Sequence, residues 1–236
     1  MRDGQESIRA KPPMRADARR NQQRILDAAR AMFGEHGTAA PLDDIARRAH
    51  VSIATLYRRF PDRAALCRQV AIEGYETVLA EARAAQEVAE EGGPDAPLRA
   101  VERFLTGVVA QRSRLVLPLF GGPAFHDEDA TDLRHRITRS LEAVLARGRE
   151  RGAVRDDVNS IDLLMTAAMI SRPLPNTPPE WLDITARRHI AVHLDGLRPG
   201  ATHHLSAPGP GHPGPEHAFS RETPTGAESP GGAHHM

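Results

Sequence analysis

The chain has 236 residues, of which 40% are hydrophobic and 26% charged, an ordinary balance for a folded protein with a hydrophobic core. Its single cysteine excludes an intrachain disulfide, and no apolar run approaches the ~20 residues of a membrane-spanning helix. The net charge is zero, but residues 1–70 hold 14 Lys and Arg against 8 Asp and Glu, which favours a negatively charged partner for this end of the chain.

The first predicted element is a polar, basic arm, residues 1–14, which we expect to be flexible. It lacks the apolar centre of a signal peptide, so we expect a cytoplasmic protein without a membrane partner. From Arg15 onward, apolar residues recur at three- and four-residue steps, and this period predicts an amphipathic helix. Gly37 ends the helix, because glycine readily takes the left-handed conformation that closes one.

Two short helices are predicted next, in close succession. Pro41 suits the start of a helix over 42–49, and Ser52 can cap the N-terminus of another over 53–60. Only residues 50–52 separate the two. A helix, a tight turn and a second short helix together form a helix-turn-helix.

The second of these short helices has two chemically different faces. Leu56 and Phe60 are spaced to anchor it in a core, whereas hydroxyl and guanidinium side chains lie on the outer side. Such groups bond phosphates, and arginine also pairs with guanine in a bidentate manner. The free N–H groups at the start of the helix attract phosphate as well. The predicted DNA-binding residues are Ser52, Ile53, Ala54, Thr55, Tyr57, Arg58 and Arg59.

The rest of the chain is predicted to be helical as far as Leu197. The helical period indicates further helices over 63–91, 98–113, 127–151, 157–172 and 178–197. No stretch has the alternation of a β-strand, so we expect an all-α fold of about nine helices. Residues 199–236 are rich in Pro, Gly and His and cannot bury enough apolar surface to offset the entropy of ordering, so we expect a disordered tail.

A known family shares the pattern of the first four predicted helices. The stretch 24–70 contains "ILDAA", then "DDIARRA", "VSIATLYRRF" and "PDRAAL" at the starts or centres of these helices. It resembles the DNA-binding domain of TetR-type (TetR/AcrR) transcriptional regulators. The sequence departs from the family pattern at Ala54, where glycine is usual, and at Arg59, where histidine is frequent.

The resemblance implies a function and a division of the chain. It implies a homodimeric repressor that binds a near-palindromic double-stranded DNA operator and responds to an unidentified small-molecule effector, with no catalytic residue and no cofactor. The DNA-binding domain would span 15–62, and a helical ligand-binding and dimerisation domain would span 63–198.

Two further sets of residues follow from this division. The apolar region over 104–125, whose helical pattern breaks at Pro118 and at Gly121-Gly122, is predicted to line the effector pocket. Its candidates are Phe104, Val108, Leu117, Phe120, Phe125 and Met165. In the family, the last two helices form the dimer interface. Candidates for it are Ile161, Leu164, Met165, Ala168, Met169, Trp181, Ile184, Ile190 and Leu194, each of which suits intrachain core equally well.

Two other functions stay open on the sequence alone. One is a helical ligand-binding or scaffolding protein whose basic N-terminal domain docks on a protein partner. The other is a helical enzyme, although the chain has no Walker loop, no G-x-S-x-G, no G-x-G-x-x-G and no H-E-x-x-H motif. His189 and His193 lie four residues apart, but no nearby Glu or Cys completes a metal site, so we expect none.

Overall fold

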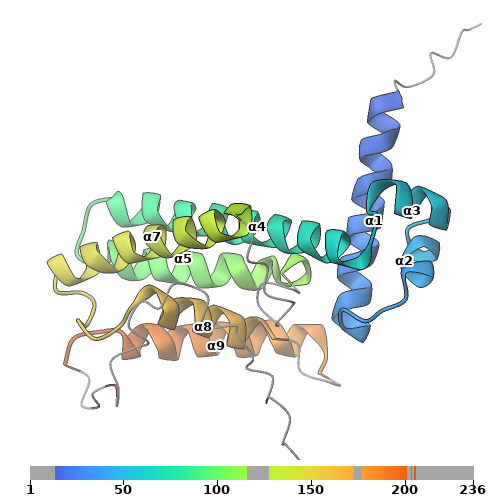
Figure 1. The fold of residues 1–236 in the computed structure, drawn as a ribbon. Coiled ribbons are helices and arrows are strands. Elements are labelled where there is room, and N and C mark those ends of the chain that lie inside the picture. Colours follow the sequence, from blue (N-terminus) through green and yellow to red (C-terminus); the bar gives the residue numbers. More distant parts are fainter. Residues whose placement is uncertain (1–13, 116–127, 173–176, 201–202, 204, 206–236) are drawn as a thin grey trace, which may run out of the picture.

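The computed structural model describes residues 14–115, 128–172, 177–200, 203 and 205. Eight α-helices and one short 3-10 helix, with no strand, make up these ranges (Figure 1), and the predicted all-α fold is confirmed. None of these helices combines the length and the apolar character that crossing a bilayer requires. The expected arm, up to residue 13, and almost all of the expected tail lie outside the described residues.

One end of the molecule is a small helical unit, residues 14–71, which we call the headpiece (Figure 1). The headpiece contains α1 (Met14–His36), α2 (Leu42–Arg48), α3 (Ile53–Arg59) and the first turns of α4 (Arg63–Glu90). Its core consists mainly of Ile25, Leu26, Ala29, Phe33, Ile45, Ala46, Leu56, Phe60, Leu66 and Val70. These positions repeat at three and four residues along each helix, and this period explains why the sequence located the helices correctly.

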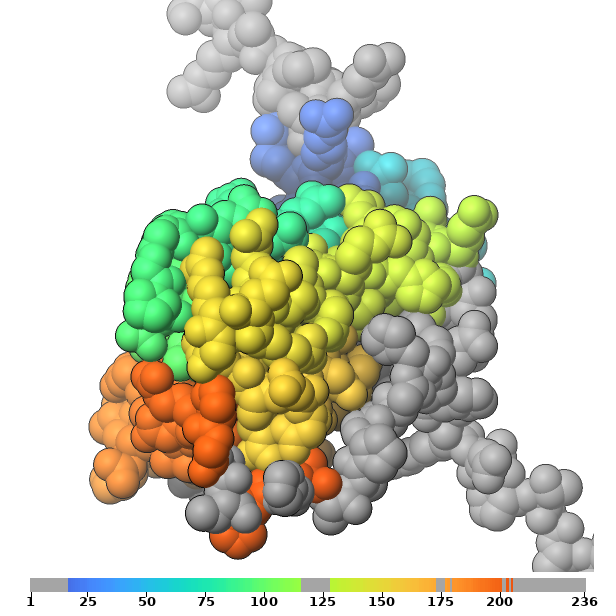
Figure 2. Space-filling view, turned by 90° about the vertical axis from the view of Figure 1, so that its left-hand side faces the viewer, coloured from blue at the N-terminus to red at the C-terminus, as the bar shows by residue number. Residues whose placement is uncertain are grey.

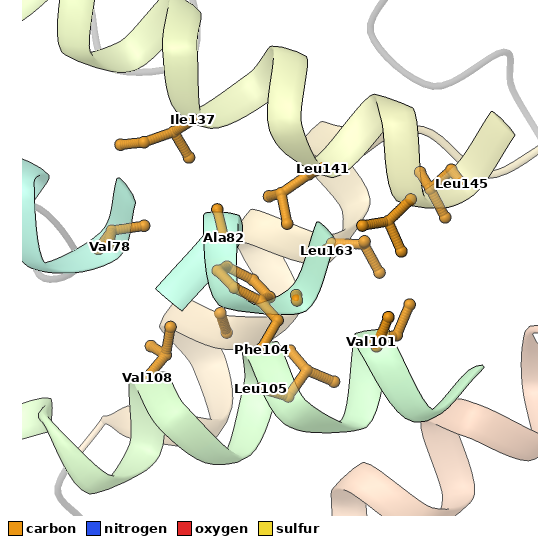
Figure 3. Close-up of a cluster of buried hydrophobic side chains, with 14 of the residues drawn as sticks. Val78, Ala82, Val101, Phe104, Leu105, Val108, Ile137, Leu141, Leu145 and Leu163 are labelled. Carbon is orange, nitrogen blue, oxygen red and sulfur yellow. The ribbon is translucent and has the colours of Figure 1, made fainter. Parts of the chain in front are cut away.

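The larger part of the molecule is a helical body with a core of its own. It contains the rest of α4 with α5 (Ala96–Ala110), η1 (Arg112–Arg114), α7 (Glu128–Glu150), α8 (Ser160–Ser171) and α9 (Pro179–Gly196). Helices α4, α5 and α7 lie together on one side and α8 and α9 on the other (Figure 1). Figure 3 shows Phe104 of α5 at the centre, between Ala82 of α4, Leu141 of α7 and Leu163 of α8.

Helix α4 runs through both the headpiece and the body. Two of its residues near the headpiece also contact α7. Tyr75 packs against both hydrophobic cores, and the guanidinium of Arg134 lies 5.7 Å from the centre of its ring. Nearer the headpiece, Arg68 pairs with Asp129 at 2.8 Å. A shift of α7 along α4 would therefore act directly on the turns of α4 that carry the headpiece.

A buried arginine joins α1 to α4 through an ion pair at the edge of the headpiece core. Arg30 is 7% exposed, donates to Asp27 at 2.6 Å and pairs with Glu73. The core itself continues as far as Ala71 of α4, past the predicted domain boundary at residue 62. The division of function between the two parts stays a prediction.

Figure 2 shows the end of the molecule that is remote from the headpiece, where α4, α7 and α9 meet. The guanidinium of Arg151, just after α7, donates to the carbonyls of Glu91 and Gly93 at 3.2 and 3.1 Å. Arg198, just after α9, lies 3.4 Å from the carboxylate of Asp95. These contacts fasten the loop between α4 and α5 to the ends of two other helices.

Candidate nucleic-acid interface

The turn between α2 and α3 is a helix-closing motif that places one residue in the left-handed region. His50 has a φ of 53°. The amide of Val51 donates to the carbonyl of Ala46 at 3.0 Å, and the amide of His50 donates to that of Arg47 at 3.1 Å. This pair of bonds is the Schellman arrangement, whose left-handed position is usually glycine. Arg24 on α1 donates to the carbonyl of His50 at 2.9 Å and so fixes the turn against the first helix.

Replacing His50 by glycine is expected to stabilise the headpiece by about 0.5–1 kcal/mol. The left-handed conformation costs a residue with a side chain roughly 1–2 kcal/mol, and glycine avoids this cost. Glycine loses more conformational entropy on folding, which offsets about 0.5–1 kcal/mol of the gain. Thermal unfolding measures the change. The matched control is His50→Val, which should lower stability because a β-branched residue tolerates positive φ least. A His50→Gly variant that melts below the wild type would contradict the strain assigned to this turn.

Two of the predicted DNA-binding residues cap the N-terminus of α3. Ser52 is the N-cap, and its Oγ accepts from the amide of Thr55 at 3.2 Å and lies 2.8 Å from the hydroxyl of Thr55. The next residue, Ile53, packs partly buried against the headpiece core. Leu56 and Phe60 are buried and hold the helix from beneath. The helix is therefore anchored along one side.

The opposite side of α3 is open to solvent. Ala54, Tyr57 and Arg58 are exposed, with 49% of Tyr57 accessible, and the spacing of three and four residues places them on one face. Arg59 is exposed too, but its Nη2 donates to the carbonyl of Ala18 on α1 at 3.1 Å. The structure thus brings the predicted residues together on one short helix, with Ile53 turned to the core. Their role in binding stays a prediction.

A neighbouring ion pair on the surface joins α2 to α1. The terminal Nη1 and Nη2 of Arg48 donate to the carboxylate of Glu35, at 2.6 and 2.8 Å. The hydrogen bond from Arg48 lowers the pKa of Glu35 and raises the pKa of Arg48 in turn. Sequence reasoning missed this pair because the two residues lie on different helices.

The predicted effector-pocket residues are not gathered around one described cavity. Phe104 and Val108 are completely buried in the core of the body, whereas Met165 is exposed on α8. Leu117, Phe120 and Phe125 lie outside the described residues. The pocket stays a prediction.

Two surface hollows are present that the sequence did not indicate. A polar cleft of about 650 Å³ lies between α1, α4 and the end of α5, and its lining includes Arg30, Gln69, Glu73, Glu76, Gln111 and Arg114. A mostly apolar groove of about 400 Å³ runs between α8 and α9, and its lining includes Met169, Ile170, Leu182, Ala186, Val192 and His193. No local sequence pattern indicates either hollow, because each forms between turns of separate helices that face one another.

A helix-turn-helix at one end of a long helix, carried by an all-helical body, defines a DNA-binding transcriptional regulator. Residues 25–70 match the family described as bacterial regulatory proteins, tetR family. Residues 96–199 match the C-terminal domain of SbtR-like transcriptional regulators. The chain belongs to the TetR family of transcriptional regulators.

Solved structures of the family have the same architecture. A TetR transcription regulatory protein from Mycobacterium vanbaalenii is 28% identical over 79% of this chain and 99% of its own, with a TM-score of 0.51. PfmR from Thermus thermophilus is 26% identical over 76% of this chain and 98% of its own, with a TM-score of 0.59. AibR, in complex with isovaleryl coenzyme A and operator DNA, covers the same shares at 14% identity and a TM-score of 0.59, a likeness of fold alone. No curated protein matches the chain.

Proposed function

We propose that the protein is a homodimeric repressor that binds a near-palindromic operator and responds to a small-molecule effector. The observation that carries the proposal is the open face of α3, with Ala54, Tyr57 and Arg58, on a helix that is anchored from beneath. In the major groove this face offers Arg58 to guanine or phosphate and the hydroxyl of Tyr57 to phosphate. Ser52 and Thr55 lie at the N-terminal end of α3, where the helix dipole favours a phosphate.

An uncovered apolar face on α8 and α9 supports the dimer. Met165, Met169, Trp181 and Ile184 are exposed there, and large exposed apolar residues gathered on one face are typical of interaction sites. A two-fold axis through this face would pair it with itself. The two α3 helices of the dimer would then enter successive major grooves, ~34–36 Å apart.

The groove between α8 and α9 adds a second argument for the same face. The Nε2 of His193 is buried there and has no hydrogen-bond partner among the described residues. Burial lowers the pKa of His193, which favours the neutral ring. A second protomer seated on this groove would cover its apolar lining.

The response to an effector is proposed to pass through α4. A ligand in the body that shifts α7 along α4 would move the turns beside Arg68 and Tyr75, and with them the headpiece. The loss of operator affinity cannot exceed the ligand's preference for one arrangement over the other, commonly ~1–3 kcal/mol. The solved structure of AibR, which has the same fold, is in complex with isovaleryl coenzyme A and operator DNA, so this fold can hold a small molecule as well as DNA.

The variant Arg58→Ala tests the DNA interface. Selection of bound fragments from genomic DNA first supplies an operator, and titrations then give its Kd. We expect affinity to fall by roughly 10- to 100-fold, the effect of losing one bidentate base contact. The matched control is Arg47→Ala, because Arg47 is also exposed, on α2, but pairs with Asp44 at 2.7 Å.

Two outcomes would count against the proposed interface. Unchanged operator binding by Arg58→Ala would remove the open face of α3 from it. If no fragment is retarded by the wild type even at low salt, where phosphate contacts are strongest, a headpiece that docks on a protein is favoured instead.

A further inference from the structure

Most arginines of the headpiece are held by other groups of the protein. Arg20 pairs with Asp17, Arg30 with Asp27 and Glu73, Arg47 with Asp44, Arg48 with Glu35, and Arg68 with Asp129. Arg24, Arg59 and Arg63 donate to the carbonyls of His50, Ala18 and Thr38. Within the described side chains of the headpiece, Arg19 on α1 and Arg58 on α3 have no such partner, and both are exposed.

Arg59 links the two segments that carry these unpaired guanidinium groups. Its Nη2 donates at 3.1 Å to the carbonyl of Ala18, the residue that precedes Arg19. The bond fastens the last turn of α3 to the first turns of α1. Figure 1 shows this N-terminal part of α1 running past α3 and beyond the rest of the headpiece.

We propose that Arg19 is a second DNA contact of the headpiece and grips a backbone phosphate just beyond the C-terminal end of α3. Arg59 is then a positioning residue that holds α1 in place for this contact. The proposal rests on the proposed function, in which α3 lies in the major groove. The phosphate backbones form the walls of that groove, so a segment tied to one end of α3 comes next to one of them. A guanidinium without an internal carboxylate keeps its charge and its donors for a phosphate.

A phosphate contact has a signature that a base contact lacks. Each neutralised phosphate contributes ~0.9 to the slope of log K against log salt, and it does so on any DNA sequence. Arg19→Ala should therefore weaken binding to the operator and to unrelated DNA by the same factor and reduce the slope by about 1. Arg58→Ala should lose more on the operator than on unrelated DNA.

The experiment measures Kd over a range of salt for the full-length wild type and Arg19→Ala, on both DNAs. Two controls are matched to it. Arg147→Ala removes the same charge from an exposed position in the last turn of α7, at the remote end of the body. The double variant Asp17→Ala/Arg20→Ala removes the neighbouring ion pair of α1 at constant net charge. We expect both controls to keep the wild-type slope.

A double-mutant cycle tests the part assigned to Arg59. If Arg59 only positions α1, then Arg59→Ala weakens binding in the wild type and has almost no further effect in Arg19→Ala, because coupled residues are not additive. If Arg59 touched DNA itself, its loss would reduce the slope by about 1 in both backgrounds. That second result would overturn the assignment.

The outcomes separate this inference from the function on which it rests. A wild type that binds no DNA would remove the proposed function itself. A wild type that binds an operator, with Arg19→Ala at the wild-type slope, would overturn the contact of Arg19 alone. Equal effects of Arg19→Ala and Arg147→Ala would also overturn it, since they would show a general effect of charge.

Discussion

Met169→Glu is expected to convert the proposed dimer into a monomer at micromolar concentration. Met169 is 76% exposed in the protomer and lines the groove between α8 and α9, beside Val192, which is 72% exposed. In a two-fold interface each substitution occurs twice, so two carboxylates would lose water without a partner. Because burying an unpaired charge costs several kcal/mol, we expect the dimer to dissociate with a Kd raised by on the order of 100-fold or more.

The same variant should lose operator binding without losing its fold. A dimer binds the second half-site as an intramolecular event at an effective concentration in the millimolar range, and a monomer forfeits this gain, on the order of 100-fold or more in affinity. Sedimentation gives the oligomeric state, titration gives the affinity, and thermal unfolding shows that the protomer is intact. The matched control is Thr106→Glu, on an exposed stripe of α5 that already carries Glu102 and Arg103.

The control is expected to behave as the wild type in all three measurements. A Met169→Glu variant that sediments as a dimer would exclude this face of α8 and α9 as the interface. A monomeric variant with full operator affinity would keep the interface and refute the need for two half-sites.

Phe104→Ala is expected to lower the free energy of unfolding by about 3–5 kcal/mol, the usual cost of truncating a buried aromatic residue. Its ring is fully buried and is surrounded by side chains from α4, α5, α7 and α8 (Figure 3). Four helices would border the cavity, so no single helix could move to fill it. Denaturant unfolding of the protein without effector measures the change.

Tyr57→Ala is the matched control for an aromatic truncation. Tyr57 lies on the open face of α3 and is about half exposed, so its loss should change stability by less than about 1 kcal/mol. A cost for Phe104→Ala as small as that of Tyr57→Ala would mean that Phe104 borders an open pocket, the role predicted from the sequence. A core role and a pocket role of Phe104 therefore predict different losses in the free energy of unfolding.

The helix-turn-helix shows how far local sequence reasoning reaches. Pro41 and Ser52 correctly indicated the starts of α2 and α3, and Asp62 caps α4, its carboxylate accepting from the amide of Ala65 at 2.7 Å. The position of the turn was also predicted, but its left-handed residue, His50, was not. Histidine is only a weak signal for positive φ, and the fold imposes that conformation.

The apolar residues of α8 and α9 mark where the same reasoning stops. On sequence alone, Ile190 and Met169 suited interface and core equally, and the structure buries the first while leaving the second exposed. Both are apolar and both occur at helical spacing. Which one faces the body depends on the rotation of each helix against α5, and a single helix does not encode that rotation.

The sequence by itself determined the helices and the helix-turn-helix, because caps, breakers and a period of 3.6 residues are local properties. The family followed from the motifs of residues 24–70. Only the tertiary structure decided which arginines are bonded within the protein and which are left exposed. Arg58 and Arg59 are adjacent and chemically identical, yet Arg59 bonds a carbonyl 41 residues away and Arg58 has no partner within the described headpiece. Contacts between distant segments arise only when the helices pack, and they separate the arginines that hold the headpiece together from those that stay exposed without a partner in the described headpiece.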